Sequence, residues 1–454
     1  MRVNAFRLFR KRGRKLSYRQ SFLGKFRGYT LTELLVAVVV STIILSTLLF
    51  FTTSLVNSNR DEEAKATTQE EITAALNYIA NDLQESVFIY GASALERNST
   101  QDPPGIADQI PYGSSTPAAG VQARNTQRRP ILAFWKRNYL DVEQEVETSS
   151  GTTRKVKCLP YPTGTTACYG QSKFVYSLVV YYLWKDNSPT WSGTARLARW
   201  EIKDGIIWSC VDTSTAAQTD SSKCPVADAT AGVRSDGDPL TADPVYVVKP
   251  SRGFRLFAVS GAGTLAEKMN RWTKFPGESY DLSDDPMRVL VDFIDDTPYY
   301  TQFDDGTSVN LIKINARPNQ TPSVVGYETP INADCDSPDR GVGVPRAGTP
   351  SQSAFAERVP STFSATGSDL NVYRLSSFYA CVANFGNPNQ TVARVWLRGN
   401  PRARYLVNDD IRRAEIKSKV EGCIADPSGP CSPVDSQFVT GDIRVLGRGQ
   451  FKLE

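Results

Sequence analysis

The chain has 454 residues, enough to bury a sizeable core, and a formal net charge of +4. The first 28 residues hold ten Lys and Arg and no acid, so the rest carries 42 basic against 48 acidic residues, about −6. This balance argues against a nucleic-acid-binding body. The chain has no histidine, which excludes Ser-His-Asp and Cys-His nucleophile activation and His-ligated zinc, so we expect no enzyme activity.

An uncharged apolar segment, Leu34 to Phe51, follows this basic head. Its 18 residues span about 27 Å as a helix, close to the bilayer hydrocarbon thickness of about 30 Å. The positive-inside rule then places the N-terminus in the cytoplasm and the body outside. A secretory signal cleaved after the segment fits poorly, because a charged stretch lies between it and the nearest small-residue site. A buried helix of a soluble protein would leave the charge asymmetry unexplained, whereas an uncleaved anchor remains an alternative.

The junction between the basic head and the apolar segment contains a carboxylate, Glu33, at the mouth of the apolar run. An unpaired charge deep in a bilayer costs about 2.5–3.5 kcal/mol on insertion scales, so Glu33 calls for a partner. Cleavage after Gly28 would make the α-amine of Tyr29 a cation at the start of the helix. Both this amine and the helix dipole would favour a nearby carboxylate.

This junction, GYTLTELLVA from Gly28 to Ala37, resembles the N-terminal signal of type IV prepilins. The resemblance implies that a prepilin peptidase cleaves after Gly28, that Tyr29 becomes the N-methylated first residue, and that Glu33 neutralises the amine of a neighbouring subunit. It also implies other pilins or pseudopilins, an inner-membrane assembly platform and membrane lipid as partners. Two departures are a first residue that is Tyr where Phe is commoner, and the absence of proline before Pro103, as in many pseudopilins.

A closer resemblance rests on three segments: Tyr29 to Ala37, the QESVFIY sequence ending at Tyr90, and the RVWLRGN sequence at Arg394 to Asn400. Together they are similar to the pseudopilins of cyanobacterial hormogonium polysaccharide secretion. This resemblance implies a minor component that supports polysaccharide secretion and motility.

Helical periodicity continues beyond the apolar segment, with Ile72, Leu76, Ile79 and Leu83 on one face. The pattern predicts one helix from about Tyr29 to about Tyr90, whose second half packs on a sheet. We therefore divide the chain into a cleaved leader (1–28), a transmembrane or filament-core helix (29–58), its amphipathic continuation (59–95) and an extracytoplasmic β-rich body (96–454).

The body alternates short β-rich runs with polar loops, which predicts an α+β, pilin-like fold with an antiparallel sheet. The expected strands are Pro130 to Lys136, Phe174 to Trp184, Arg196 to Ile202, Ile206 to Cys210, Gly253 to Val259, Arg288 to Phe293, Val309 to Asn315, Phe378 to Ala383 and Val392 to Arg398. The Lys203-Asp204-Gly205 turn predicts a hairpin. Polar stretches at 97–127, 143–170, 213–243 and 317–367 are expected to be loop insertions, and the tail from Asp409 remains unassigned.

The eight cysteines all lie between Cys158 and Cys431, which fits disulfides in an oxidising compartment outside the cytoplasm. Pairing of sequence neighbours would join Cys158 with Cys168, Cys210 with Cys224, Cys335 with Cys381, and Cys423 with Cys431. Eight cysteines allow 105 connectivities, so other pairings remain open. Disulfide-stapled loops are favoured over a metal site because the short C-x₂₋₄-C spacing is absent.

Two acidic clusters and one aromatic run are the remaining candidate sites. The clusters are Asp281, Asp284 and Asp285, and then Asp292, Asp295, Asp296, Asp304 and Asp305. Without EF-hand spacing they are interpreted as solvated turns, with a calcium site as the alternative, and we expect no other cofactor or metal. The run from Tyr181 to Trp184 alternates faces on a strand, which favours core packing over a sugar-stacking platform.

These features together favour a non-enzymatic minor pilin or pseudopilin of a type IV pilus-like or type II secretion-like assembly. The alternative is a membrane-anchored extracytoplasmic adhesin or carbohydrate-binding protein whose helix is only an anchor. A tethered hydrolase is disfavoured, because no nucleophile motif accompanies the missing histidine.

Overall fold

A computed structural model of the chain describes residues 30–147, 153–159, 171–207, 246–248, 250–259, 262–296, 300–304, 309–313, 356–364, 367–368, 370–384, 391–405 and 439–447. The chain divides into two compact units, Met1–Asn59 and Arg60–Glu454. The long helix α1 (Leu31–Gln84) continues through the boundary between them.

The first unit contains the apolar part of α1, and every residue of it from Thr30 to Asn59 is exposed. The large apolar side chains point outward on all sides, with exposed fractions such as 83% for Leu31 and 77% for Phe50. Several hydroxyl groups within this segment donate to backbone carbonyls three or four residues earlier, as Thr42 does to Val39 and Thr52 to Leu48. Such local bonds let an apolar helix carry hydroxyls without unsatisfied donors.

The second unit begins with the rest of α1, which buries one face against the body. The expected apolar stripe is confirmed, because Ile72, Leu76, Ile79 and Leu83 are all buried. The expected end of the helix near Tyr90 is wrong: α1 ends at Gln84, and Ser86–Ile89 form strand β1. These β-branched and aromatic residues pair with strand β2, where Ile89 faces Phe134. The segment 59–95 is therefore not a single helix, since the short helix α2 (Ala92–Glu96) follows β1.

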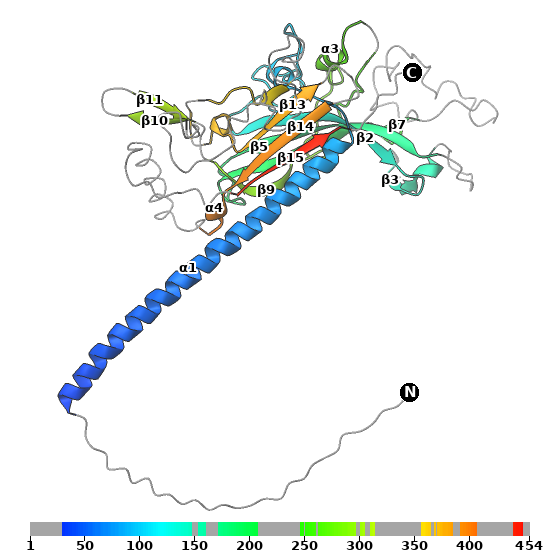
Figure 1. The fold of residues 1–454 in the computed structure, drawn as a ribbon. Coiled ribbons are helices and arrows are strands. Elements are labelled where there is room, and N and C mark those ends of the chain that lie inside the picture. Colours follow the sequence, from blue (N-terminus) through cyan, green and yellow to red (C-terminus); the bar gives the residue numbers. More distant parts are fainter. Residues whose placement is uncertain are drawn as a thin grey trace, which may run out of the picture. The chain divides into compact units, whose positions relative to one another are not determined.

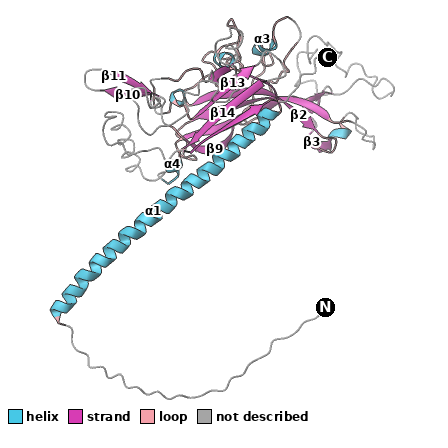
Figure 2. Ribbon diagram, viewed as in Figure 1, coloured by secondary structure: helices cyan, strands magenta, loops and turns pink. Residues whose placement is uncertain are grey.

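One antiparallel sheet of nine strands forms the centre of the second unit, which confirms the α+β class (Figures 1 and 2). Its strands run in the order β1-β2-β5-β6-β9-β14-β13-β12, and β15 pairs with β14. Besides β1 they are β2 (Arg128–Leu140), β5 (Lys173–Trp184), β6 (Ala195–Lys203), β9 (Arg288–Ile294), β12 (Ala356–Val359), β13 (Phe378–Asn384), β14 (Thr391–Gly399) and β15 (Val439–Leu446).

Smaller elements surround this sheet. Three two-stranded ribbons pair β3 (Glu145–Glu147) with β4 (Thr153–Lys155), β7 (Ile206–Ile207) with β8 (Tyr246–Val248), and β10 (Tyr300–Asp304) with β11 (Val309–Lys313). Two short helices are α3 (Leu265–Asn270) and α4 (Pro401–Tyr405). The predicted insertion at 97–127 is an ordered loop that adds Ile106 and Ile110 to the main hydrophobic core.

Two glycines let α1 approach the sheet closely at β14 and β15. A Cβ atom on Gly399 would lie 2.5 Å from the methyl group of Thr68, and one on Gly441 would lie 2.7 Å from a methyl group of Leu76. Both distances are too short for real carbon contacts, so the strands have no room for a Cβ atom at these two positions beneath the helix. In Figure 1 the body-proximal part of α1 runs alongside these strands.

Most expected strands form, but two local predictions are wrong. The predicted hairpin at Lys203–Gly205 does not form: β7 pairs with β8, and Lys203 at the end of β6 bonds to Ser251. The predicted strand Gly253 to Val259 has no ladder partner in the described structure. It is held by isolated bonds, such as that from the Trp272 indole to the Arg255 carbonyl.

Candidate processing and assembly site

The N-terminus of α1 is capped by two side chains that satisfy each other's backbone. The amide of Glu33 donates to the Thr30 hydroxyl oxygen at 3.3 Å, and the amide of Thr30 donates to the Glu33 carboxylate at 3.3 Å. The Thr30 hydroxyl also donates to that carboxylate at 3.2 Å. This reciprocal pattern is a capping box, which satisfies amides that a helix start leaves without partners.

The capping box gives Glu33 a structural role in helix capping that sequence reasoning missed. Its sequence signature, Thr followed three residues later by Glu, was present. The carboxylate remains exposed at the positive end of the helix dipole, where it can also accept from an external cation. The predicted cleavage residues Gly28 and Tyr29 lie outside the described residues, so their roles stay predictions.

The other end of α1 is tied to the sheet by a buried carboxylate. Asp82 is 5% exposed and accepts hydrogen bonds from Lys136 Nζ, Arg199 Nε and the Tyr181 hydroxyl, each at 2.8 Å. Burial alone would raise the pKa of Asp82, but the charges of Arg199 and Lys136 more than offset this and hold it below its ordinary value.

Sequence reasoning did not identify Asp82 as a buried contact. The available signal was its spacing, because Asp82 follows Ile79 by three residues and so lies on the apolar face. A carboxylate at such a position requires a charged partner on the surface that the helix covers.

The aromatic run on β5 packs in the core, as the strand period predicted. Tyr181 and Tyr182 are fully buried, and their hydroxyl groups donate hydrogen bonds to different segments. Tyr181 donates to the Asp82 carboxylate of α1 and Tyr182 to the carbonyl of Pro111. Burial raises the pKa of both phenols well above the ordinary value. The two rings therefore anchor the helix and the 97–127 loop.

The described carboxylates of the second acidic cluster each contact a different partner and do not form a common site. Asp292 accepts from the amide and hydroxyl of Ser192, Asp295 forms a buried pair with Arg398, and Asp296 pairs with Lys185 at 2.7 Å. Nothing is described of the Asp304 side chain, and Asp305 lies outside the described residues.

The first acidic cluster forms a hydrogen-bonded turn. Asp281 accepts from Ser283, and Asp285 accepts from the Ser251 hydroxyl at 3.0 Å, with Asp284 between them. Among the residues that the structure describes, no three His, Cys, Asp or Glu side chains gather as a metal-binding group.

Two of the eight cysteines lie within the described structure, Cys158 after β4 and the fully buried Cys381 on β13. Both are disulfide-bonded. Cys168, Cys210, Cys224, Cys335, Cys423 and Cys431 lie outside the described residues, so the four predicted pairings remain predictions.

Comparison with known proteins assigns the N-terminal segment. Residues 23–49 match the family model described as the prokaryotic N-terminal methylation motif. No curated protein and no solved structure matches the chain. Within the described residues, one helix, α1, is long and apolar enough to cross a membrane. The chain thus carries a type IV pilin-like prepilin signal leading into an apolar helix, which indicates a membrane-anchored, single-pass protein.

Proposed function

We propose that the chain is a minor pilin or pseudopilin, a structural subunit of a type IV pilus-like or type II secretion-like assembly. The observation that carries this proposal is the methylation motif at residues 23–49, which extends into a helix whose apolar side chains are all exposed as far as Asn59. Fully burying one large aliphatic or aromatic side chain is worth about 1.5–3 kcal/mol. The exposed helix therefore needs lipid before assembly and the helices of other subunits afterwards.

The proposed subunit has the body outside the cytoplasm, with disulfides formed in the oxidising compartment there. Its large body, with the predicted loop insertions, favours a minor component, because each copy of a major subunit must pack against many others. We propose a structural rather than enzymatic role, without a required cofactor, with a prepilin peptidase, other pilins and an assembly platform as partners. The similarity of Tyr29 to Ala37 and Arg394 to Asn400 to hormogonium pseudopilins supports a role in polysaccharide secretion and motility.

The processing step is tested by the intact mass of the protein purified from membranes of the producing cells. We expect a chain that begins at N-methylated Tyr29. A Gly28→Val variant should keep the leader, whereas Gly24→Val, the same change four residues earlier, should be processed normally. If the wild-type chain in membranes began at Met1, the pilin-like proposal would be rejected. The helix would then be an uncleaved anchor for an unrelated ectodomain.

The secretion role is tested separately by removing the chain from the producing cells. Release of polysaccharide into the medium should fall, and the wild-type and Gly24→Val chains should restore it. The unprocessed Gly28→Val chain should not restore it. Unchanged release in cells without the chain would reject the secretion role while leaving the pilin-like assignment intact.

A further inference from the structure

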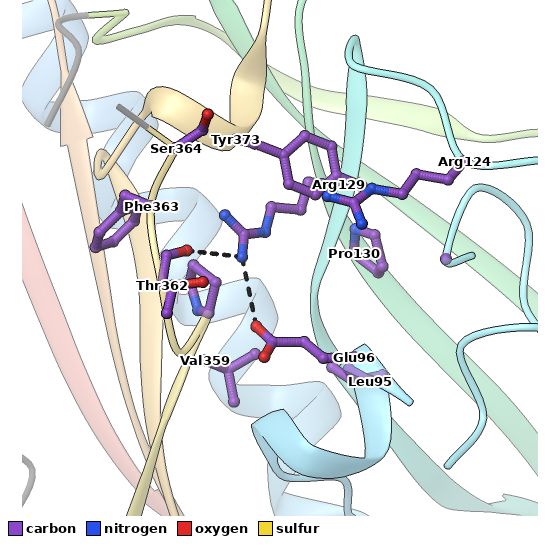
Figure 3. A pocket seen from close by; sticks show the side chains of 12 residues that line it. Leu95, Glu96, Arg124, Arg129, Pro130, Val359, Thr362, Phe363, Ser364 and Tyr373 are labelled. Atoms are coloured by element: carbon purple, nitrogen blue, oxygen red, sulfur yellow. Dashed lines mark hydrogen bonds and ion pairs between the residues drawn. The ribbon is translucent and has the colours of Figure 1, made fainter. Parts of the chain in front are cut away.

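A cavity of about 270 Å³ lies in the body between α2, the start of β2 and the segment that follows β12. Its lining includes Glu96, Arg124, Arg129, Phe363 and Tyr373 (Figure 3). The volume is near the lower end of the roughly 300–1,000 Å³ common for small-molecule sites. The cavity is remote in sequence from the processing signal and plays no part in the function proposed above.

The guanidinium of Arg129 lies at the centre of this lining, between Thr362 and Tyr373 (Figure 3). Arg129 is only 6% exposed. Its Nη2 donates to the Thr362 carbonyl at 2.9 Å and, over a longer 3.4 Å, to the Glu96 carboxylate. Its buried Nη1 has no hydrogen-bond partner in the described structure. A buried donor left unpaired is costly, so this nitrogen calls for an acceptor.

Positive charge in the cavity exceeds what its own carboxylate offsets. Arg124 and Arg129 both lie against the Tyr373 ring, with their guanidinium carbons 4.0 Å and 4.7 Å from its centroid. Glu96 is engaged elsewhere, since it accepts from the amide of Ser361 at 3.0 Å and from the Ser361 hydroxyl. Burial and, to a smaller extent, the charge of Arg124 together lower the pKa of Arg129 to about 10, although Tyr373 and Glu96 act in the opposite direction.

Beside its polar groups, the cavity lining includes several apolar residues. Leu95, Pro130, Val359, Pro360 and Phe363 contribute to the lining. An inorganic anion gains nothing from such walls, whereas an organic molecule that carries an anionic group can bury its carbon skeleton against them. Planar guanidinium groups match the two oxygens of a carboxylate.

We propose that this cavity binds a small organic carboxylate. Its oxygens accept from the exposed guanidinium of Arg124 and, once a small side-chain movement opens the buried Nη1 of Arg129, from that nitrogen, while its carbon skeleton packs on Phe363 and the prolines. The competing interpretation is structural: Arg129 would serve only to tie β2 to the segment after β12 through Thr362.

The proposal is tested by calorimetric titration of the full, processed chain in detergent with two matched pairs of probes. Glucuronate and glucose share a hydroxylated ring, and cyclohexanecarboxylate and cyclohexylmethanol share an apolar ring. In each pair only the first probe carries a carboxylate. We expect at least one carboxylate to bind, its neutral partner to bind at least about tenfold more weakly, and inorganic phosphate likewise. No binding by either carboxylate, or equal binding by the neutral partner or phosphate, would overturn the proposal.

Variants separate binding from fold maintenance. Arg124→Gln changes an exposed side chain and should weaken the carboxylate about tenfold without lowering the unfolding temperature. Glu96→Gln removes the competing negative charge and should tighten binding several-fold. Arg137→Gln, which removes an arginine from the far end of β2, is the matched control and should leave affinity unchanged. If the Arg124→Gln and Arg137→Gln variants bound the carboxylate equally well, Arg124 would not take part in binding and the proposal would be overturned.

Discussion

The carboxylate of Asp82, in the last turn of α1, lies 2.8 Å from Nε of Arg199 on β6. Lys136 of β2 and Tyr181 of β5 bind the same carboxylate, so a single helix side chain is bound by three neighbouring strands. Because Asp82 is buried, solvent screens these contacts little. The helix is thus held by a charge cluster as well as by its apolar stripe.

Replacing Asp82 with asparagine should lower the free energy of unfolding by about 3 kcal/mol, because it leaves buried cations without their shared counter-charge. The matched control is Glu85→Gln, since Glu85 also pairs with Lys136 but its side chain is 52% exposed. This control should cost no more than about 1 kcal/mol. Urea unfolding of the full chain in detergent, followed by tryptophan fluorescence, measures both, and equal losses would show that the buried cluster contributes no more than a surface pair.

Acid should weaken the body through the same cluster. Burial raises the pKa values of Asp82 and Glu201, but their contacts with Arg199 leave both below the ordinary 3.8 and 4.5. Each carboxylate therefore contributes stability that is present above its ordinary pKa and is lost as the pH falls through the lowered one. The urea midpoint should fall below about pH 4, and the fall should be smaller in Asp82→Asn. An identical acid profile in that variant would contradict this assignment.

Adding a methyl group at the close approach between α1 and β14 should also destabilise the body. In Gly399→Ala the new Cβ meets the methyl group of Thr68, a stiff β-branched side chain, and the overpacking should cost about 1–3 kcal/mol. Thr440→Val changes an exposed residue of the adjacent strand β15 and should stay within about 0.5 kcal/mol. Thermal unfolding distinguishes them, and a neutral Gly399→Ala would show that the helix can shift to accept the group.

The two possible roles of Glu33 can be separated by variants of the capping box. Thr30→Ala removes the hydroxyl cap but keeps the carboxylate, and should cost helix stability of about 1 kcal/mol with little effect on incorporation into filaments. Glu33→Ala removes both roles and should impair incorporation while leaving membrane insertion and cleavage intact. Glu62→Ala, on the same helix beyond the apolar segment, is the control. Quantitative immunoblotting of sheared filaments measures incorporation. Equal defects in Thr30→Ala and Glu33→Ala would assign Glu33 to capping alone.

Sequence reasoning located the elements whose signals are local. The apolar helix follows from 18 uncharged residues, and β5 and β14 follow from continuous β-branched and aromatic runs. The end of α1 was misplaced because Ser86–Ile89 also fits a helical period. Only pairing with β2, more than forty residues later in the chain, makes this segment a strand rather than a helix.

The parts that could not be predicted depend on contacts between distant segments. Strand β15 is polar along much of its exposed face and is recognisable only through its ladder with β14. The hairpin after Lys203 failed because a turn signal does not reveal which distant segment pairs with the strand that follows it, here β8 with β7. Likewise, Arg129 follows another arginine in the sequence, and only folding brings Arg124, Glu96 and Thr362 around it.

The capping box has a consequence for how subunits of the proposed kind would join. The Glu33 carboxylate is not without a partner before assembly, because it already accepts a hydrogen bond from the backbone amide of Thr30. Docking the amine of another subunit would therefore exchange one set of donors for another, and the net gain would be the difference between two satisfied states. A junction built on such an exchange would be selective for correct geometry and weak enough to be reversible.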